Sequence, residues 1–142
     1  LTAAHALSQA FERAGATWDA LAVLHAARAR LGPRLDLAAL GGDLALRSGI
    51  LDDAVLFGWD RLVFRSRDPD ALVWQGNVLR LAGRHAEARM LLDEAVRIAP
   101  GAADAYVALG ELERARGDEA AARAFFERAH RIAPDHPAFR PR

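Results

Sequence analysis

The sequence contains no cysteine and no lysine, although it has 142 residues and 19 basic side chains. The absence of cysteine excludes disulfides, thiolate metal ligands and thiol nucleophiles. The absence of lysine excludes Schiff-base chemistry and the lysine of a phosphate-binding loop. Every basic residue is therefore an arginine, a bias that a GC-rich genome explains without any functional cause.

Long apolar runs and net charge are also lacking. No stretch reaches the roughly 18 apolar residues that span a bilayer, so we expect no membrane insertion. The 19 acidic residues balance the 19 basic ones, so no overall field attracts nucleic acid. A chain without cysteine suits both cytoplasm and periplasm, and we favour the cytoplasm. Because the chain begins at Leu1, we expect a processed chain or an excerpt of a longer protein.

A 34-residue period runs through the chain. The segment Arg-Ile-Ala-Pro at 97–100 recurs unchanged at 131–134. Glycines and alanines keep the same phase, namely Gly15, Gly49, Gly83 and Gly117, and Ala20, Ala54, Ala88 and Ala122. The repeats are 1–34, 35–68, 69–102 and 103–136. The tail at 137–142 is similar at its start to the beginning of another repeat.

Each repeat is predicted to form two helices. In the last repeat, apolar residues recur at helical spacing over 103–116 and again over 119–132. Gly117 suits a left-handed residue just after the first helix, and Asp118 suits the cap of the second. Neither helix can bury its apolar face alone, so neighbouring pairs must stack into a continuous core.

The pattern resembles the tetratricopeptide repeat. Repeat four carries the signature residues Tyr106, Leu109, Gly110, Ala122, Phe126, Ala129 and Pro134. The resemblance covers residues 1–136 and implies an all-α fold, a right-handed α-solenoid of about eight helices in one domain. It also implies a non-catalytic scaffold that holds a peptide or protein segment in a concave groove. Two alternatives are a regulatory or substrate-presenting module of a larger bacterial enzyme (sulfotransferase, glycosyltransferase or oxygenase) and a self-assembling array.

Repeat two departs from the pattern. Gly42 stands at the packing glycine, but Gly58 occupies the bulky position of the second helix and Arg61 its small position. The second helix must therefore repack locally or leave Trp59 or Phe64 exposed. An exposed apolar patch there would serve self-association or a partner.

No catalytic or metal-binding constellation is recognised. The five histidines are His5, His25, His85, His130 and His136, and no two have the i, i+4 spacing of a helical metal site. We expect His136, in the tail, to be solvated. The three serines lack the glycines of a nucleophile elbow. We therefore expect no enzyme, no metal and no cofactor.

The first helices line the groove in the family that the chain resembles, and helical phase then selects the residues that face it. A polar row contains Gln9, Asp43, Asn77 and Glu111, which suit hydrogen bonds to a peptide backbone. An arginine row contains Arg13, Arg47, Arg80 and Arg114. Because guanidinium groups bind carboxylates in a bidentate manner, we expect an acidic or carboxyl-terminal partner. The alternative is that these arginines only offset helix dipoles.

Trp74 lies on the same face as Asn77 and is the predicted anchor for a partner side chain. Gln75 occupies a position where the family usually has leucine, so a small rotation of this helix would instead bury Trp74. The carboxylate clamp of the chaperone-tail subclass uses lysine, and His5 and Gln9 stand at two of its positions. That particular partner is therefore disfavoured.

Overall fold

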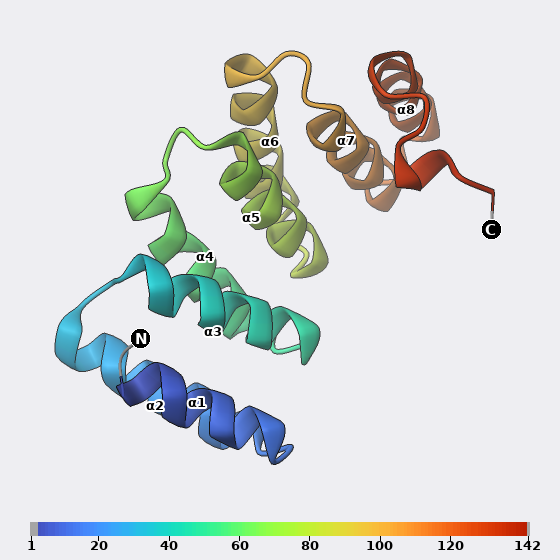
Figure 1. Cartoon of the computed structure of the whole chain (residues 1–142). Helices are drawn as coiled ribbons and strands as arrows, with labels where there is room; N and C mark the ends of the chain where they lie inside the picture. The colour runs from blue at the N-terminus through green and yellow to red at the C-terminus, as the bar shows by residue number, and fades with distance from the viewer. Residues whose placement is uncertain (1–2, 142) are drawn as a thin grey trace. The chain divides into compact units, whose positions relative to one another are not determined.

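The computed structural model describes residues 3–141, which form eight α-helices and one short 3₁₀-helix, with no strand among them (Figure 1). The helices are α1 (Ala3–Arg13), α2 (Thr17–Leu31), α3 (Leu35–Arg47), α4 (Leu51–Phe64), α5 (Pro69–Leu81), α6 (His85–Ile98), α7 (Ala103–Ala115) and α8 (Glu119–Ile132). The 3₁₀-helix η1 follows at Pro137–Phe139. The predicted all-α class and the eight helices are confirmed.

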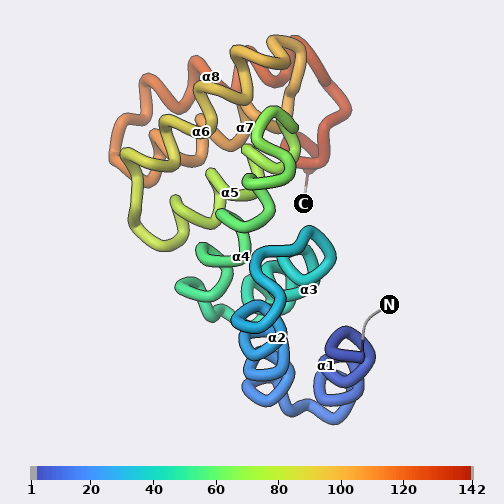
Figure 2. The backbone as a smooth tube through the Cα atoms, turned by 90° about the vertical axis from the view of Figure 1, so that its left-hand side faces the viewer, coloured from blue at the N-terminus to red at the C-terminus, as the bar shows by residue number. Residues whose placement is uncertain are grey.

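The chain divides into two compact units, Leu1–Ser66 (unit 1) and Arg67–Arg142 (unit 2). In unit 1, α1 packs on α2, α2 on α3, and α3 on α4. In unit 2, α5 packs on α6, α7 on α8, and α7 also contacts both α5 and α6. Figure 2 shows the antiparallel course of the paired helices within each unit. A single domain over 1–136 remains a prediction.

The turn inside each helix pair depends on a glycine in the left-handed region. Gly117 has φ +87°, as its place in the sequence predicts, and the other three turn glycines have φ between +72° and +76°. After α7, the N–H of Asp118 donates to the carbonyl of Glu113 over 2.9 Å, the six-to-one bond of a Schellman motif. A side chain at this backbone conformation would be strained, which explains the constant phase of the glycines.

Close approach of the two helices in a pair depends on a second glycine. A Cβ on Gly110 would lie 2.6 Å from the ring of Phe126, and a Cβ on Gly76 would lie 2.7 Å from Leu92. Both distances are far below van der Waals contact, so only glycine lets the bulky side chain of the second helix reach the first.

In repeat two, the close contact between the paired helices involves residues one position earlier than the repeat pattern predicts. The glycine that meets Phe57 is Gly41, one residue before the predicted Gly42, since a Cβ on Gly41 would lie 2.7 Å from the ring. Phe57 is fully buried and Asp60 is 5% exposed. Phe57 precedes Gly58, which is also buried, and Asp60 precedes Arg61, which is partly buried. Because Ala54 stays buried at its repeat position, α4 widens its buried face to include the ring of Phe57. This is the local repacking that the sequence offered as one alternative.

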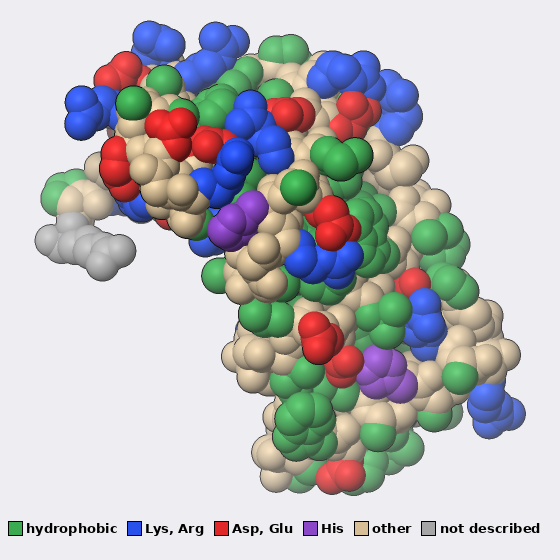
Figure 3. Space-filling model, turned by 180° about the vertical axis from the view of Figure 1, so that it is seen from behind, with side chains coloured by type: hydrophobic (Ala, Val, Ile, Leu, Met, Phe, Trp, Pro, Cys, Tyr) green, Lys and Arg blue, Asp and Glu red, His purple; other side chains and the backbone are tan. Residues whose placement is uncertain are grey.

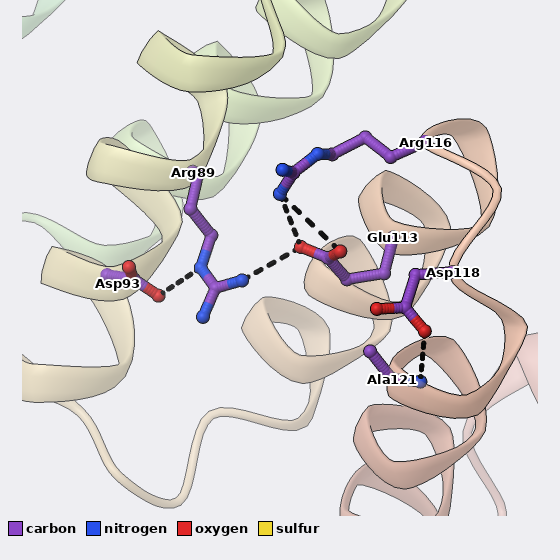
Figure 4. Close-up of polar contacts among 6 residues, drawn as sticks. All are labelled: Arg89, Asp93, Glu113, Arg116, Asp118 and Ala121. Atoms are coloured by element: carbon purple, nitrogen blue, oxygen red, sulfur yellow. Dashed lines mark hydrogen bonds and ion pairs between the residues drawn. The ribbon is translucent and has the colours of Figure 1, made fainter.

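Each unit contains one buried carboxylate that accepts hydrogen bonds from arginine. In unit 1, Asp60 of α4 accepts two from Arg28 of α2, one of them over 2.9 Å. In unit 2, Glu113 of α7 lies between Arg89 of α6, at 2.8 Å, and Arg116, at 3.1 Å (Figure 4). The hydrogen bond to Asp60 raises the pKa of Arg28 above its ordinary value. These contacts tie one helix pair to the next within each unit.

Candidate functional site

A groove of about 730 Å³ lies between α5 and α7, the two first helices of unit 2. Its lining residues are Asp70, Val73, Trp74, Asn77 and Arg80 of α5 and Asp104, Val107, Ala108 and Glu111 of α7. Four positions of α5 recur in α7 after 34 residues, so the two helices present the same stripe in register. Helical phase places these nine residues on one stripe of the two helices, and that stripe also includes Leu81, Arg114 and Ala115, which are not among the lining residues. That the stripe binds a partner remains a prediction.

Trp74 lines this groove and is partly exposed, whereas Gln75 beside it is fully buried. The helix has therefore kept the orientation in which Trp74 faces the groove, and the alternative rotation does not occur. Asn77 follows one turn later on the same stripe, and Glu111 is its counterpart in α7. The groove thus combines an indole, two aliphatic side chains and an amide on one surface.

The charges of the groove are arranged along the helices. Asp70 and Asp104 are each the second residue of their helix, whereas Arg80 is in the last turn of α5. The side chain of Arg80 lines the groove and forms no hydrogen bond or ion pair with another described residue. Among the described residues, the side chains of Asp70 and Asn77 likewise form no hydrogen bond or ion pair. Three polar groups of the groove are therefore available to a ligand.

Most of the corresponding polar groups in unit 1 have partners. Gln9 contacts His5 at 2.9 Å, and the Nε of Arg13 donates to the carbonyl of Gln9 over 3.3 Å. Arg47 of α3 pairs with Glu12 of α1 at 2.6 Å. Asp43 is exposed to solvent. These four predicted residues thus lie in a different electrostatic setting from those of unit 2.

The predicted arginines do not form one row. Arg13 and Arg47 are 34 residues apart, but only 33 residues separate Arg47 from Arg80. A difference of one residue moves the side chain by about 100° around its helix. Arg80 reaches into the groove, while Arg114 lies with its guanidinium carbon 4.8 Å from the centre of the Phe126 ring. Arg114 also has Glu111 at 3.8 Å and Glu119 at 3.9 Å.

His136 is not solvated, contrary to expectation. Its side chain is 17% exposed, and its Nε2 bonds the carboxylate of Asp104, at the edge of the groove. Its Nδ1 accepts a hydrogen bond from the N–H of Ala138 over 3.1 Å and so caps η1. Asp68 caps α5 in the same way, because its side chain accepts a hydrogen bond from the N–H of Asp70, two residues later. The similarity of the tail at 137–142 to the start of a repeat is the sequence feature from which this cap could have been predicted.

The two residues predicted for self-association lie in α4. Phe64 is 49% exposed and its neighbour Val63 is 68% exposed, whereas Trp59 is partly buried. Phe64 also lines a shallow depression with Leu35 and Ala39 of α3. An apolar surface therefore exists at the end of α4, and Trp59 contributes less to it than Phe64.

The remaining surface mixes both signs of charge. Figure 3 shows acidic and basic side chains lying close together over much of one face. Within residues 3–141, no three histidine or acidic side chains are grouped as a metal ion would need, and no helix is both long and apolar enough to cross a bilayer.

Comparisons with known proteins agree with the repeat pattern. Residues 68–135 match the tetratricopeptide repeat family. No curated protein matches the chain in sequence. Among solved structures, YrrB, described as a tetratricopeptide repeat protein with an unusual peptide-binding site, is 19% identical with a TM-score of 0.79, over 94% of this chain and 69% of YrrB.

Two structures of MamA are also similar. One is 18% identical with a TM-score of 0.74, over 89% of this chain and 74% of MamA. The other, from Desulfovibrio magneticus RS-1, is 13% identical with a TM-score of 0.76, over 94% of this chain and 76% of that one. Identities this low show a shared fold. Residues 68–135 thus match the tetratricopeptide repeat family, and the chain has the fold of tetratricopeptide repeat proteins.

Proposed function

We propose that this chain is a non-catalytic scaffold that binds an extended segment of a partner protein in the groove of unit 2. The observation that carries the proposal is the convergence of Trp74, Asn77 and Arg80 on one groove, where the amide of Asn77 and the guanidinium of Arg80 have no partner among the described residues. Binding sites of this kind combine apolar area with a few uncommitted polar groups. YrrB, which shares the fold, is described as having a peptide-binding site.

Each groove residue has a distinct part in the proposed complex. Trp74, with Val73 and Val107, offers the apolar area that buries one side chain of the segment. The amide of Asn77 can donate to and accept from a peptide backbone, and Glu111 can accept from a backbone N–H. Arg80 offers a donor to a carboxylate. Gln9, Arg13, Asp43, Arg47 and Arg114 remain candidates for contacts with a longer segment.

Peptide display on the whole chain, followed by titration of the selected peptides, tests this proposal. The chain has three tryptophans, so the Trp18→Phe, Trp59→Phe double variant leaves Trp74 as the only fluorescent indole. We expect bound peptide to shift the emission of Trp74, and Asn77→Ala to weaken binding about tenfold through the lost hydrogen bonds. Asp52→Ala, an exposed carboxylate of α4 outside the candidate set, is the control and should bind normally. Selected peptides that bind Asn77→Ala and the parent chain equally would place the site elsewhere.

A second candidate function is self-association through the end of α4. The exposed Phe64 and Val63 favour it, with the partly buried Trp59 beside them in sequence. Light scattering over a concentration series should show a rising mass that Phe64→Ser abolishes. A constant monomer mass at all concentrations would contradict this second function. Fusion to a larger enzyme stays a prediction, which the length of the full gene decides.

A further inference from the structure

We infer that the groove of unit 2 selects segments of mixed charge, with a basic side chain near Asp70 and Asp104 and a carboxylate near Arg80. The inference rests on the proposed function and names the class of ligand. It also replaces the expectation of an acidic partner, because three carboxylates and one guanidinium line the groove. A uniformly acidic segment would face Asp70, Asp104 and Glu111, and a uniformly basic one would leave Arg80 without an acceptor.

The geometry separates the two charged ends. Asp70 and Asp104 occupy the same position of neighbouring helices, so both carboxylates lie at one end of the groove. Arg80 follows Asp70 by ten residues, which corresponds to about 15 Å along the helix axis. An extended peptide spans this distance with about four or five residues. Trp74 lies between the two ends, so the segment should carry an apolar residue between its charges.

The charged groups at both ends retain capacity for a ligand. The carboxylate of Asp70 forms no hydrogen bond or ion pair among the described residues. Asp104 bonds His136 through Oδ1, which leaves Oδ2 to receive a cation. The guanidinium of Arg80 lines the groove and forms no hydrogen bond or ion pair with another described residue, so it can bind a carboxylate.

Unit 1 lacks this arrangement, although its repeats are in the same register. Asp36 stands where Asp70 does, but it is paired with Arg34 at 3.1 Å. Leu46 stands where Arg80 does, and the neighbouring Arg47 is paired with Glu12. The charge pattern that selects a ligand is therefore specific to unit 2.

Blocked hexapeptides with the whole chain test the inference. The first has arginine at position one, leucine at position three, glutamate at position six and alanine elsewhere, and the second has the two charges exchanged. Two further peptides carry arginine at both ends or glutamate at both ends. We expect one of the first two to bind at least fivefold tighter than either same-charge peptide, in 50 mM salt. The advantage should shrink at 300 mM salt because the ion pairs are screened.

Charge reversal identifies the groups involved. Arg80→Glu should weaken the preferred peptide about tenfold and strengthen the peptide with two arginines. Asp70→Asn with Asp104→Asn should weaken the preferred peptide about fivefold, while the control Asp36→Asn should not. A peptide that lacks glutamate but ends in a free carboxyl group distinguishes a chain terminus from a side chain as the carboxylate. Circular dichroism monitors folding, and Arg80→Gln replaces Arg80→Glu if the latter unfolds.

The outcomes separate this inference from the proposed function. Equal binding of all four peptides, with the loss caused by Asn77→Ala retained, would overturn charge selection and leave the groove as the binding site. The absence of any binding, for these peptides and for displayed ones, would overturn both. A preference for the same-charge acidic peptide that Arg80→Gln removes would restore the simpler expectation of an acidic partner.

Discussion

Units 1 and 2 share one repeat pattern but use their polar side chains differently. In unit 1, Arg34 pairs with Asp36 and Arg47 pairs with Glu12, so charged groups of the first helices neutralise each other. In unit 2, the side chains of Asp70 and Arg80 have no such partner among the residues that the structure describes. A repeat can therefore keep its fold while a few neighbouring charges decide whether its exposed face is available to a ligand.

The cores of the two units also differ in one helix. In α8 the small position is Ala129, fully buried, whereas in α4 that position is Arg61 and the buried residue is its neighbour Asp60. The carboxylate is buried with its arginine partner, Arg28, because a lone charge in a core would be far too costly. The large aromatic residue is fully buried in α4, as Phe57, but only partly in α8, as Phe126.

The largest expected effect concerns these two aromatic residues. Phe57→Ala should lower the free energy of unfolding by about 3–5 kcal/mol, because it empties a fully buried site against Gly41. Phe126→Ala should cost less, about 1–2 kcal/mol, since that ring is partly exposed. Urea unfolding of the whole chain, followed by circular dichroism, measures both. Equal losses would show that the cores of α4 and α8 do not differ as the burial indicates.

An intermediate effect is expected at the buried carboxylates. Arg28→Ala removes the only described partner of Asp60 and should cost about 3 kcal/mol. Arg89→Ala should cost about 1 kcal/mol, because Glu113 keeps its bond to Arg116. Urea unfolding at neutral pH compares the two variants without added salt.

The control for this comparison removes the carboxylate that Arg28→Ala leaves without its partner. Asp60→Ala in the Arg28→Ala background removes the stranded carboxylate and should recover most of the lost stability. If Arg28→Ala costs no more stability than Arg89→Ala, the ion pair between Arg28 and Asp60 is weaker than its geometry indicates.

Much of this architecture could be predicted from the sequence. The 34-residue phase gave the helices, the turn at Gly117 and the groove stripe containing Trp74, because backbone conformation and helical phase depend on local sequence. The shift that brings Phe57 inward could not be predicted so simply. It depends on the volumes that meet across a helix pair, and both Gly41 and Gly42 permit close approach. The partners of Arg47 and His136 are side chains from segments 35 and 32 residues away, which periodicity does not describe.

The smallest expected effect tests the pairing of charges in unit 1. The hydrogen bond from Arg34, and then that from the N–H of Leu37, hold the pKa of Asp36 below its ordinary value. Arg34→Gln should therefore raise this pKa, which carboxyl-carbon NMR of the folded chain measures directly. Because the folded pKa is lowered, the pair stabilises the fold at neutral pH, and that contribution disappears as the pH falls through about 4 and below.

The energetic contribution should stay below about 0.5 kcal/mol, because the side chain of Asp36 is 39% exposed and solvent screens the pair. Its consequence for binding is more informative than its size. Release of Asp36 from Arg34 would give α3 the uncommitted carboxylate that α5 has in Asp70. If the pKa of Asp36 does not move in Arg34→Gln, the pair is not formed in solution, and the difference between the two units then depends on Arg80 rather than on the acidic ends of the helices.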